Sequence, residues 1–194
     1  TSSDISSAMP PFGQWYTGTR HQFLILASEL TSAGLTAGNI TSVAFDVTAL
    51  GGSSYSDFNV TIGATALTNL TSTFVTGLTN VYNSPSYTPV VGWNTLTFST
   101  PFNWNGTSNI IIGTYTTNCT TCSGGNACTY GNYNQNDFVH YSSTAFTSHA
   151  WYYSDYTSCS LNTITTASGT GTLRSNMQIN GTASTVGAGT YTWQ

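Results

Sequence analysis

The stretch SVAFDVTAL (residues 42–50) decides the fold class, because apolar and polar residues alternate along it. Val43, Phe45 and Val47 fall on one face of an extended chain, and the intervening residues fall on the other. This period of two predicts a strand that buries one face. Comparable strand signals recur in DFNVTIG (57–63), WNTLTFS (93–99), SNIIIGTYTT (108–117), DFVHYSS (137–143), HAWYYS (149–154) and SNMQING (175–181). QFLILAS (22–28) is instead a continuous apolar run, which predicts a strand covered on both faces.

One short helical signal stands out among these strands. SELTSAG (28–34) offers Ser28 as an N-cap, Glu29 in the first turn and Gly34 as a stop. Short strands with polar loops and one helix predict an all-β chain. We expect an antiparallel two-sheet β-sandwich of jelly-roll type with one short helix near residues 28–34.

The domain organisation follows from where strand signals occur. No linker composition interrupts the central part of the chain, so we expect residues 14–182 to form a single β-sandwich domain. Residues 1–13 are expected to form an N-terminal arm or an extra strand. Residues 183–194 are expected to form a C-terminal strand or a connection to a further module.

The composition is low in charge and rich in aromatic residues. Charged residues make up 4% of the chain, and its basic side chains are Arg20 and Arg174. A nucleic-acid partner is therefore excluded, since phosphates would find almost no cations. No apolar run is long enough to cross a bilayer, so membrane insertion is not expected. A surface with little charge lacks the repulsion that keeps proteins apart, which favours self-association.

The four cysteines are Cys119, Cys122, Cys128 and Cys159. Zinc sites usually pair two C-x2-C knuckles, and the chain has one, although His140 and His149 could complete a ligand set. A redox C-x-x-C would be expected at a helix N-terminus rather than in a Gly-rich loop. Two disulfides formed in an oxidising compartment fit best, and we favour Cys122–Cys128 nested inside Cys119–Cys159.

Several stretches resemble a β-sandwich surface module of Bacteroidota proteins that leave the cell by type IX secretion, many of them adhesin-like. The resemblance covers roughly residues 14 to 180 and is carried by TGTRHQFLILASELTSAGLTAGNITSVAFDVT (17–48), NVTIGATALTNLTS (59–72), GWNTLTFSTPFNWNGTSNIIIGTY (92–115) and LRSNMQI (173–179). It implies secretion and a binding or structural role at the cell surface. It transfers no catalytic residue.

The stretch HAWYYSDYTSC (149–159) contains the candidate ligand-binding residues Trp151, Tyr152, Tyr153, Asp155 and Tyr156. Flat aromatic rings beside a carboxylate can stack on sugars and hydrogen-bond their hydroxyls. Alternation places Trp151 and Tyr153 on one face of a strand and Tyr152 on the other. The competing interpretation is that one face belongs to the core and the other to cross-strand packing.

Other chemistry has less support. Asn134, Asn136 and Asp137 are oxygen-bearing calcium candidates, but the further acids of a hand-like loop are missing. We therefore expect no cofactor, with calcium as the open alternative. Six Asp or Glu residues are dispersed without a glycosidase-like pair, and no hydrolase or metalloprotease motif occurs, so we do not expect an enzyme.

These features together predict a secreted, non-catalytic structural or adhesive module of the cell surface. A self-assembling extracellular filament is one form of this hypothesis, with copies joined by strand addition through TSSDISSAMP (1–10) or GTYTWQ (189–194). The partners would be further copies of the chain, or surface glycans and proteins. The first alternative is a carbohydrate-binding module that uses surface aromatics, and the second is a hydrolase domain.

Overall fold

The computed structural model describes residues 4–6, 10–13, 15–51, 54–117, 137–155, 161–183 and 188–192, without the side chains of 4–6 and 188–192. Its strands are β1 (Asp4–Ser6), β2 (Gly18–Ile25), β3 (Gly38–Ala49), β4 (Tyr55–Thr65), β5 (Thr79–Tyr87), β6 (Gly92–Trp104), β7 (Asn109–Thr117), β8 (Phe138–Ser143), β9 (His149–Ser154), β10 (Gly169–Gly171), β11 (Leu173–Ser175), β12 (Met177–Ala183) and β13 (Ala188–Thr192). The helices are α1 (Ala27–Ser32) and the 3₁₀ turn η1 (Leu161–Thr163). No helix among the described residues has the length and hydrophobicity needed to cross a membrane.

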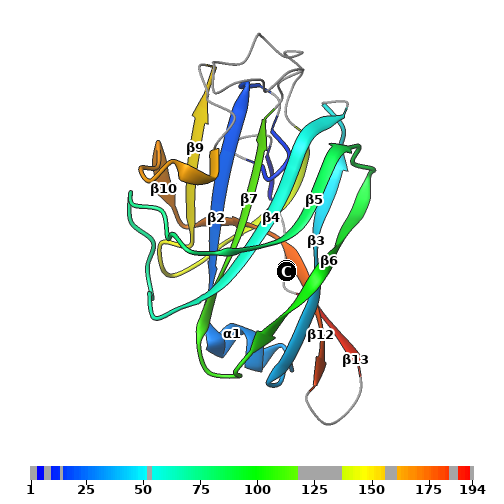
Figure 1. The fold of residues 1–194 in the computed structure, drawn as a ribbon, viewed down its shortest axis with the longest axis vertical. Helices are drawn as coiled ribbons and strands as arrows, with labels where there is room; N and C mark the ends of the chain where they lie inside the picture. The colour runs from blue at the N-terminus through cyan, green and yellow to red at the C-terminus, as the bar shows by residue number, and fades with distance from the viewer. Residues whose placement is uncertain are drawn as a thin grey trace.

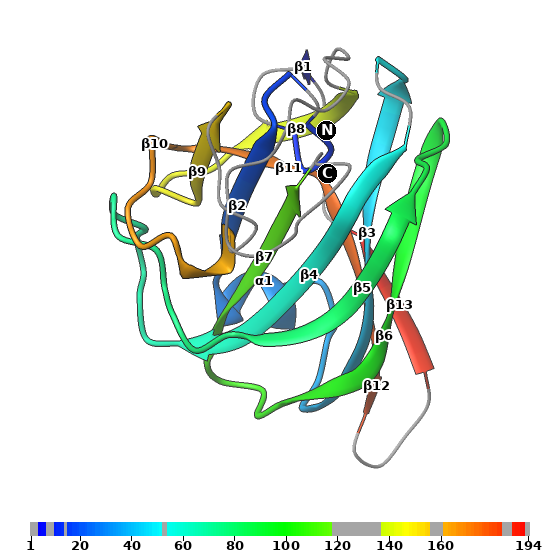
Figure 2. The ribbon, with the colours of Figure 1, turned by 45° about the horizontal axis from the view of Figure 1, so that its top comes forward.

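The strands form two sheets that pack face to face (Figures 1 and 2). The six-stranded sheet has the order β10-β9-β2-β7-β4-β5, and the seven-stranded sheet contains β1, β3, β6, β8, β11, β12 and β13. All ladders between these strands are antiparallel. The predicted all-β, two-sheet sandwich with one short helix is therefore confirmed, while its jelly-roll connectivity stays a prediction.

Strand β3 is the spine of the seven-stranded sheet. Its whole length pairs with β6, and its other side pairs first with β12 and then with β8. Val43, Phe45 and Val47 are buried in the core between the sheets, as the alternation predicts. The core also takes in Phe12, which is completely buried although it precedes the first strand of the six-stranded sheet.

Strand β2 is covered on both faces, which explains its continuous apolar sequence. Phe23 and Ile25 join the core between the sheets, whereas Leu24 belongs to a second cluster on the outside of the six-stranded sheet. We call this second cluster the outer cluster. Its buried members are Leu24, Leu70, Phe74, Ile111 and Ala150.

The outer cluster is closed by the segment that joins β4 to β5, residues 66–78, which we call the strap. The Gln22 side chain pins it, because Nε2 donates to the Val75 carbonyl (2.7 Å) and Oε1 accepts from the Val75 amide (2.8 Å). Leu78 packs closely on Gly63, because a Cβ added to Gly63 would lie only 2.7 Å from Cδ2 of Leu78. Small residues beneath the strap therefore let it lie flat on the sheet.

The helix begins earlier than its sequence suggested. Leu26 is the N-cap and α1 starts at Ala27, so Ser28 lies inside the helix rather than capping it. The Glu29 carboxylate accepts the Leu26 amide hydrogen at 2.8 Å, and this bond replaces a serine cap.

Candidate functional site

The predicted aromatic residues lie on both faces of β9. Trp151 and Tyr153 pair with His21 and Thr19 of β2, on the face that turns toward the second sheet. Tyr152 lies on the opposite face and packs against the outer cluster. All three are half-buried. The alternation prediction is thus confirmed for these three residues, and Tyr156 lies outside the described residues.

The rings of Trp151 and Tyr153 are engaged with the protein's own residues. Tyr153 stacks on Tyr16 with ring centroids 4.2 Å apart. Trp151 lies over Gly169 of β10, where an added Cβ would come within 2.6 Å of its Cζ2. This geometry supports the packing interpretation, because a ring that stacks on a sugar needs one face free.

The other predicted residues are placed only in part. Asp155 follows β9, and its main-chain carbonyl accepts the Thr17 hydroxyl at 3.2 Å. Asp137 is fully buried, with Oδ1 accepting the Gly51 amide (2.8 Å) and Oδ2 accepting the Tyr55 hydroxyl (2.9 Å). Its carboxylate therefore links the loop that contains Gly51 to the buried Tyr55 side chain. The calcium candidates Asn134 and Asn136 and the cysteines Cys119, Cys122, Cys128 and Cys159 lie outside the described residues.

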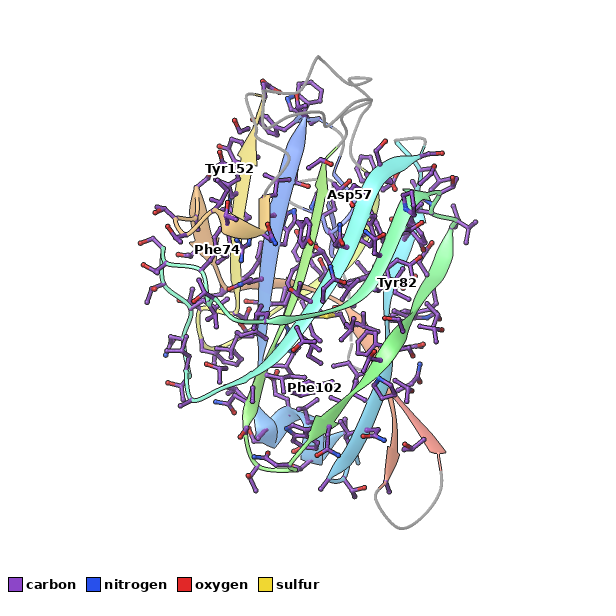
Figure 3. The ribbon with its side chains drawn as sticks, viewed as in Figure 1. Asp57, Phe74, Tyr82, Phe102 and Tyr152 are labelled. Carbon is purple, nitrogen blue, oxygen red and sulfur yellow. The ribbon has the colours of Figure 1, made fainter. Side chains whose placement is uncertain are left out.

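A different group of polar side chains forms a row across the outer face of the six-stranded sheet. The strand register places Tyr152, Arg20, Tyr115, Asn59 and Asn83 side by side on β9, β2, β7, β4 and β5. We call these residues the polar row. Figure 3 shows Tyr152 and Asp57, which lie near its two ends, together with Phe74 of the strap.

Arg20 is the charged centre of the polar row. It is only 6% exposed, and its Nη1 donates to the carbonyls of Leu161 (3.0 Å), Asn162 (2.7 Å) and Ile164 (2.6 Å). Its guanidinium carbon lies 4.6 Å from the centroid of Phe74. Burial lowers the pKa of Arg20 below its ordinary value, and the neighbouring Tyr115 acts in the opposite sense. An arginine nonetheless remains charged at neutral pH.

The β4–β5 end of the row is a network of amides around one carboxylate. Asp57 has a left-handed backbone (φ 49°), and its Oδ1 accepts from Asn59 (3.0 Å) and Asn83 (3.0 Å). Asn80 donates to Asn59 Oδ1 (2.8 Å) and to the Tyr115 hydroxyl (3.2 Å). Burial raises the pKa of Tyr115, the Asn80 bond opposes this change, and Asp57 reinforces it. The hydroxyl is therefore neutral at ordinary pH.

Between the polar row and the strap lies a pocket of about 210 Å³. Its lining residues are Arg20, Thr61, Val75, Thr76, Gly77, Leu78, Asn80, Tyr115 and Asn162. The pocket thus combines one cation with neutral hydrogen-bonding groups and a small apolar wall. Such a set can hold a small polar ligand. The sequence analysis missed it because its residues come from five separate segments and meet only through the register of the sheet.

A second polar feature is a histidine pair buried between the sheets. His21 Nδ1 lies 3.0 Å from His149 Nε2, and both rings are almost fully buried. Either ring can donate this bond, depending on which nitrogen carries the hydrogen. Burial lowers the pKa of His149 to about 3 and holds the pKa of His21 well below its ordinary value.

Other charged side chains in the described part of the chain also bond to groups within the protein. Arg174 makes a bidentate pair with Glu29, at 2.6 and 3.0 Å, and also donates to the Leu24 carbonyl at 2.7 Å. His140 lies 3.8 Å from Asp46. Among the described residues, no three His, Cys, Asp or Glu side chains gather as a metal site would require.

Comparison of the chain with models of protein families, with curated proteins and with solved structures gave no match. The fold and the geometry of its surfaces therefore carry the functional argument.

Proposed function

We propose that this chain is a secreted, non-catalytic structural or adhesive module of the cell surface, akin to the β-sandwich modules of type IX secreted Bacteroidota proteins that it resembles. We further propose that copies join into a filament by exchanging the N-terminal segment, residues 1–13. The burial of Phe12 is the observation that carries this proposal.

Phe12 fills the centre of an aromatic cluster contributed by both sheets. Its ring centroid lies 5.8 Å from that of Phe45, 5.2 Å from that of Phe58 and 5.6 Å from that of Tyr87. Its carbonyl accepts the Tyr55 hydroxyl at 3.0 Å. Removing a buried phenylalanine ring typically lowers the free energy of unfolding by about 3–5 kcal/mol. The sandwich is therefore much more stable when a phenylalanine ring fills the slot that Phe12 occupies.

The same segment also contributes the edge strand of the seven-stranded sheet. In its described part, β1 (Asp4–Ser6) pairs with Tyr141, His140 and Val139 of β8. Gly13 follows Phe12 directly and precedes β2, and a glycine tolerates the backbone change that an exchange of the segment requires. The segment of one copy could occupy the slot of the next copy with the same contacts, and exchange repeated in one direction gives an open chain of subunits.

Two surface properties favour such contacts. The chain has few charged side chains, and Arg20, Arg174, Glu29, Asp57 and Asp137 all bond within the molecule, so neighbouring copies repel one another little. Val90 and Val91, at the turn between β5 and β6, are 59% and 63% exposed, and Leu50 after β3 is 50% exposed. The ladder pairs Val47 with Gly92, which brings these apolar residues to one end of the sandwich.

The test compares assembly of the full chain with that of two cavity variants. Phe12→Ala is expected to abolish filaments seen by electron microscopy. Phe74→Ala removes an equally buried ring from the outer cluster and is expected to leave assembly intact at a temperature where both variants are folded. A synthetic peptide of residues 1–13 should shorten the assemblies, whereas its Phe12→Ala form should not. A full chain that stays monomeric at high concentration, with both ends intact, contradicts the proposal.

Carbohydrate binding through Trp151 and Tyr153 is the second candidate, favoured by the density of aromatic residues on β9. Trp151→Ala should then abolish binding on a glycan array while leaving the fold unchanged. Retained binding would remove this candidate.

A further inference from the structure

The hydrogen bonds that Arg20 makes with the main chain use only one of its three guanidinium nitrogens. Nη1 of Arg20 makes all three bonds to the carbonyls of Leu161, Asn162 and Ile164. Within the described part of the chain, Nε and Nη2 have no hydrogen-bond partner. Their N–H groups lie on one edge of the planar guanidinium and form a two-pronged donor. A donor of this shape matches the two oxygens of a carboxylate.

The protein fixes this donor before any ligand arrives. Three carbonyl bonds, the face of Phe74 and the strands on either side hold the guanidinium in one orientation. Ligand binding therefore costs little side-chain entropy, because the arginine is already ordered. The described lining of the pocket contains no carboxylate, and nearby Asp57 already accepts hydrogen bonds from Asn59 and Asn83.

The rest of the lining suits hydroxyl groups and a small apolar face. Thr61, Thr76 and Asn162 offer neutral donors and acceptors, while Val75 and Leu78 supply apolar surface. The volume of about 210 Å³ is below the range of roughly 300–1,000 Å³ that holds drug-sized ligands. One pyranose ring is a fitting occupant, with its hydroxyls on the polar side and its C–H groups on the apolar side.

We propose that this pocket binds a carboxylate-bearing sugar, a uronic acid residue, with the carboxylate on Nε and Nη2 of Arg20 and the ring between Tyr115 and the strap. This inference goes beyond the proposed assembly and does not depend on it. A single chain would bind weakly, with a Kd on the order of 1 mM. An array of copies on a surface would bind an acidic polysaccharide much more tightly through multivalency.

The test is a nuclear magnetic resonance titration of the full chain with glucuronate, using glucose and acetate as probes of the two halves of the ligand. Glucuronate should shift the amide signals of the strap, of Tyr115 and of Asn162 in a saturable way. Glucose and acetate should each bind at least tenfold more weakly. Equal affinity for acetate would make the pocket a simple anion site, and equal affinity for glucose would remove the role of Arg20. Either result overturns the proposal, as does the lack of saturable shifts.

Two pairs of variants locate the site without touching the core. Asn162→Asp adds a negative charge to an exposed lining residue and should weaken glucuronate binding about 5- to 10-fold, whereas the neutral Asn162→Ser should not. Thr76→Phe should block the pocket. Thr68→Phe, at an exposed strap position away from the lining, should bind glucuronate like the parent chain. Unchanged binding in both Asn162→Asp and Thr76→Phe would place the ligand elsewhere and overturn the proposal.

Discussion

Lowering the pH from 7 to 5 should destabilise this protein through the buried pair of His21 and His149. The His149 ring stays neutral in the folded chain at these pH values, because burial lowers its pKa to about 3. Burial also lowers the pKa of His21, with the neighbouring His149 acting in the same direction. In the unfolded chain both take up protons near pH 6.5. The unfolded state therefore binds more protons below pH 6.5, and stability falls as the pH falls from there toward about 3.

The magnitude follows from this difference in protonation. A histidine that is neutral when folded and titrates at 6.5 when unfolded costs about 2 kcal/mol between pH 7 and pH 5. For His149 alone this is a sizeable part of the 5–15 kcal/mol that stabilises a typical domain, and His21 contributes in the same direction. The 3.0 Å contact between the rings adds to the effect, since a proton on either ring removes one nitrogen as an acceptor.

The assay is urea unfolding at pH 7, 6 and 5, followed by tryptophan fluorescence. His149→Gln keeps a polar side chain beside His21 but cannot take up a proton, so the loss between pH 7 and 5 should shrink by about 2 kcal/mol. His140→Gln removes a partly exposed histidine beside Asp46 and should retain most of the loss. The reasoning is refuted if the parent chain and His149→Gln lose the same stability over this range.

Three further substitutions test the packing and the ion pairs by the same urea measurement. Gly169→Ala should lower the free energy of unfolding by about 1–3 kcal/mol, because its Cβ would lie 2.6 Å from the Trp151 ring. Gly171→Ala should be nearly neutral, because its Cβ would lie 3.4 Å from the same ring. Equal effects of the two substitutions would contradict the placement of the ring. Glu29→Gln should cost about 1–3 kcal/mol through the partly buried pair with Arg174, while Asp46→Asn, with its looser contact of 3.8 Å to His140, should change stability by less than about 1 kcal/mol. Tyr55→Phe removes the hydroxyl that donates to Asp137 and Phe12 and should cost about 1–3 kcal/mol; a neutral result would show that neither bond stabilises the fold.

The long central strands of this fold can be predicted from the sequence because each of them buries at least one face. The alternation in residues 42–50 identifies β3 and its inward residues, and the apolar run at residues 22–28 indicates that β2 is covered on both faces. The start of α1 was misplaced, because Glu29 caps the helix from inside while Ser28, the better intrinsic cap, does not.

The candidate site could not be found in the same way. Arg20, Tyr115 and Asn59 are far apart in sequence and become neighbours only through the register of three strands. The alternation along a strand indicates which of its residues face outward, but it does not say which strands become neighbours in the sheet. The aromatic residues of β9, by contrast, were conspicuous in sequence, yet two of them pack against Tyr16 and Gly169. Density of aromatic residues indicates packing more often than binding.

The central claim is that copies of this chain assemble through the N-terminal segment. Electron microscopy of the concentrated full chain tests it most directly. Regular filaments, in which density for residues 10–13 of each subunit fills the Phe12 slot of its neighbour, are the predicted result. Isolated particles, or filaments in which every Phe12 occupies the slot of its own subunit, would contradict the account.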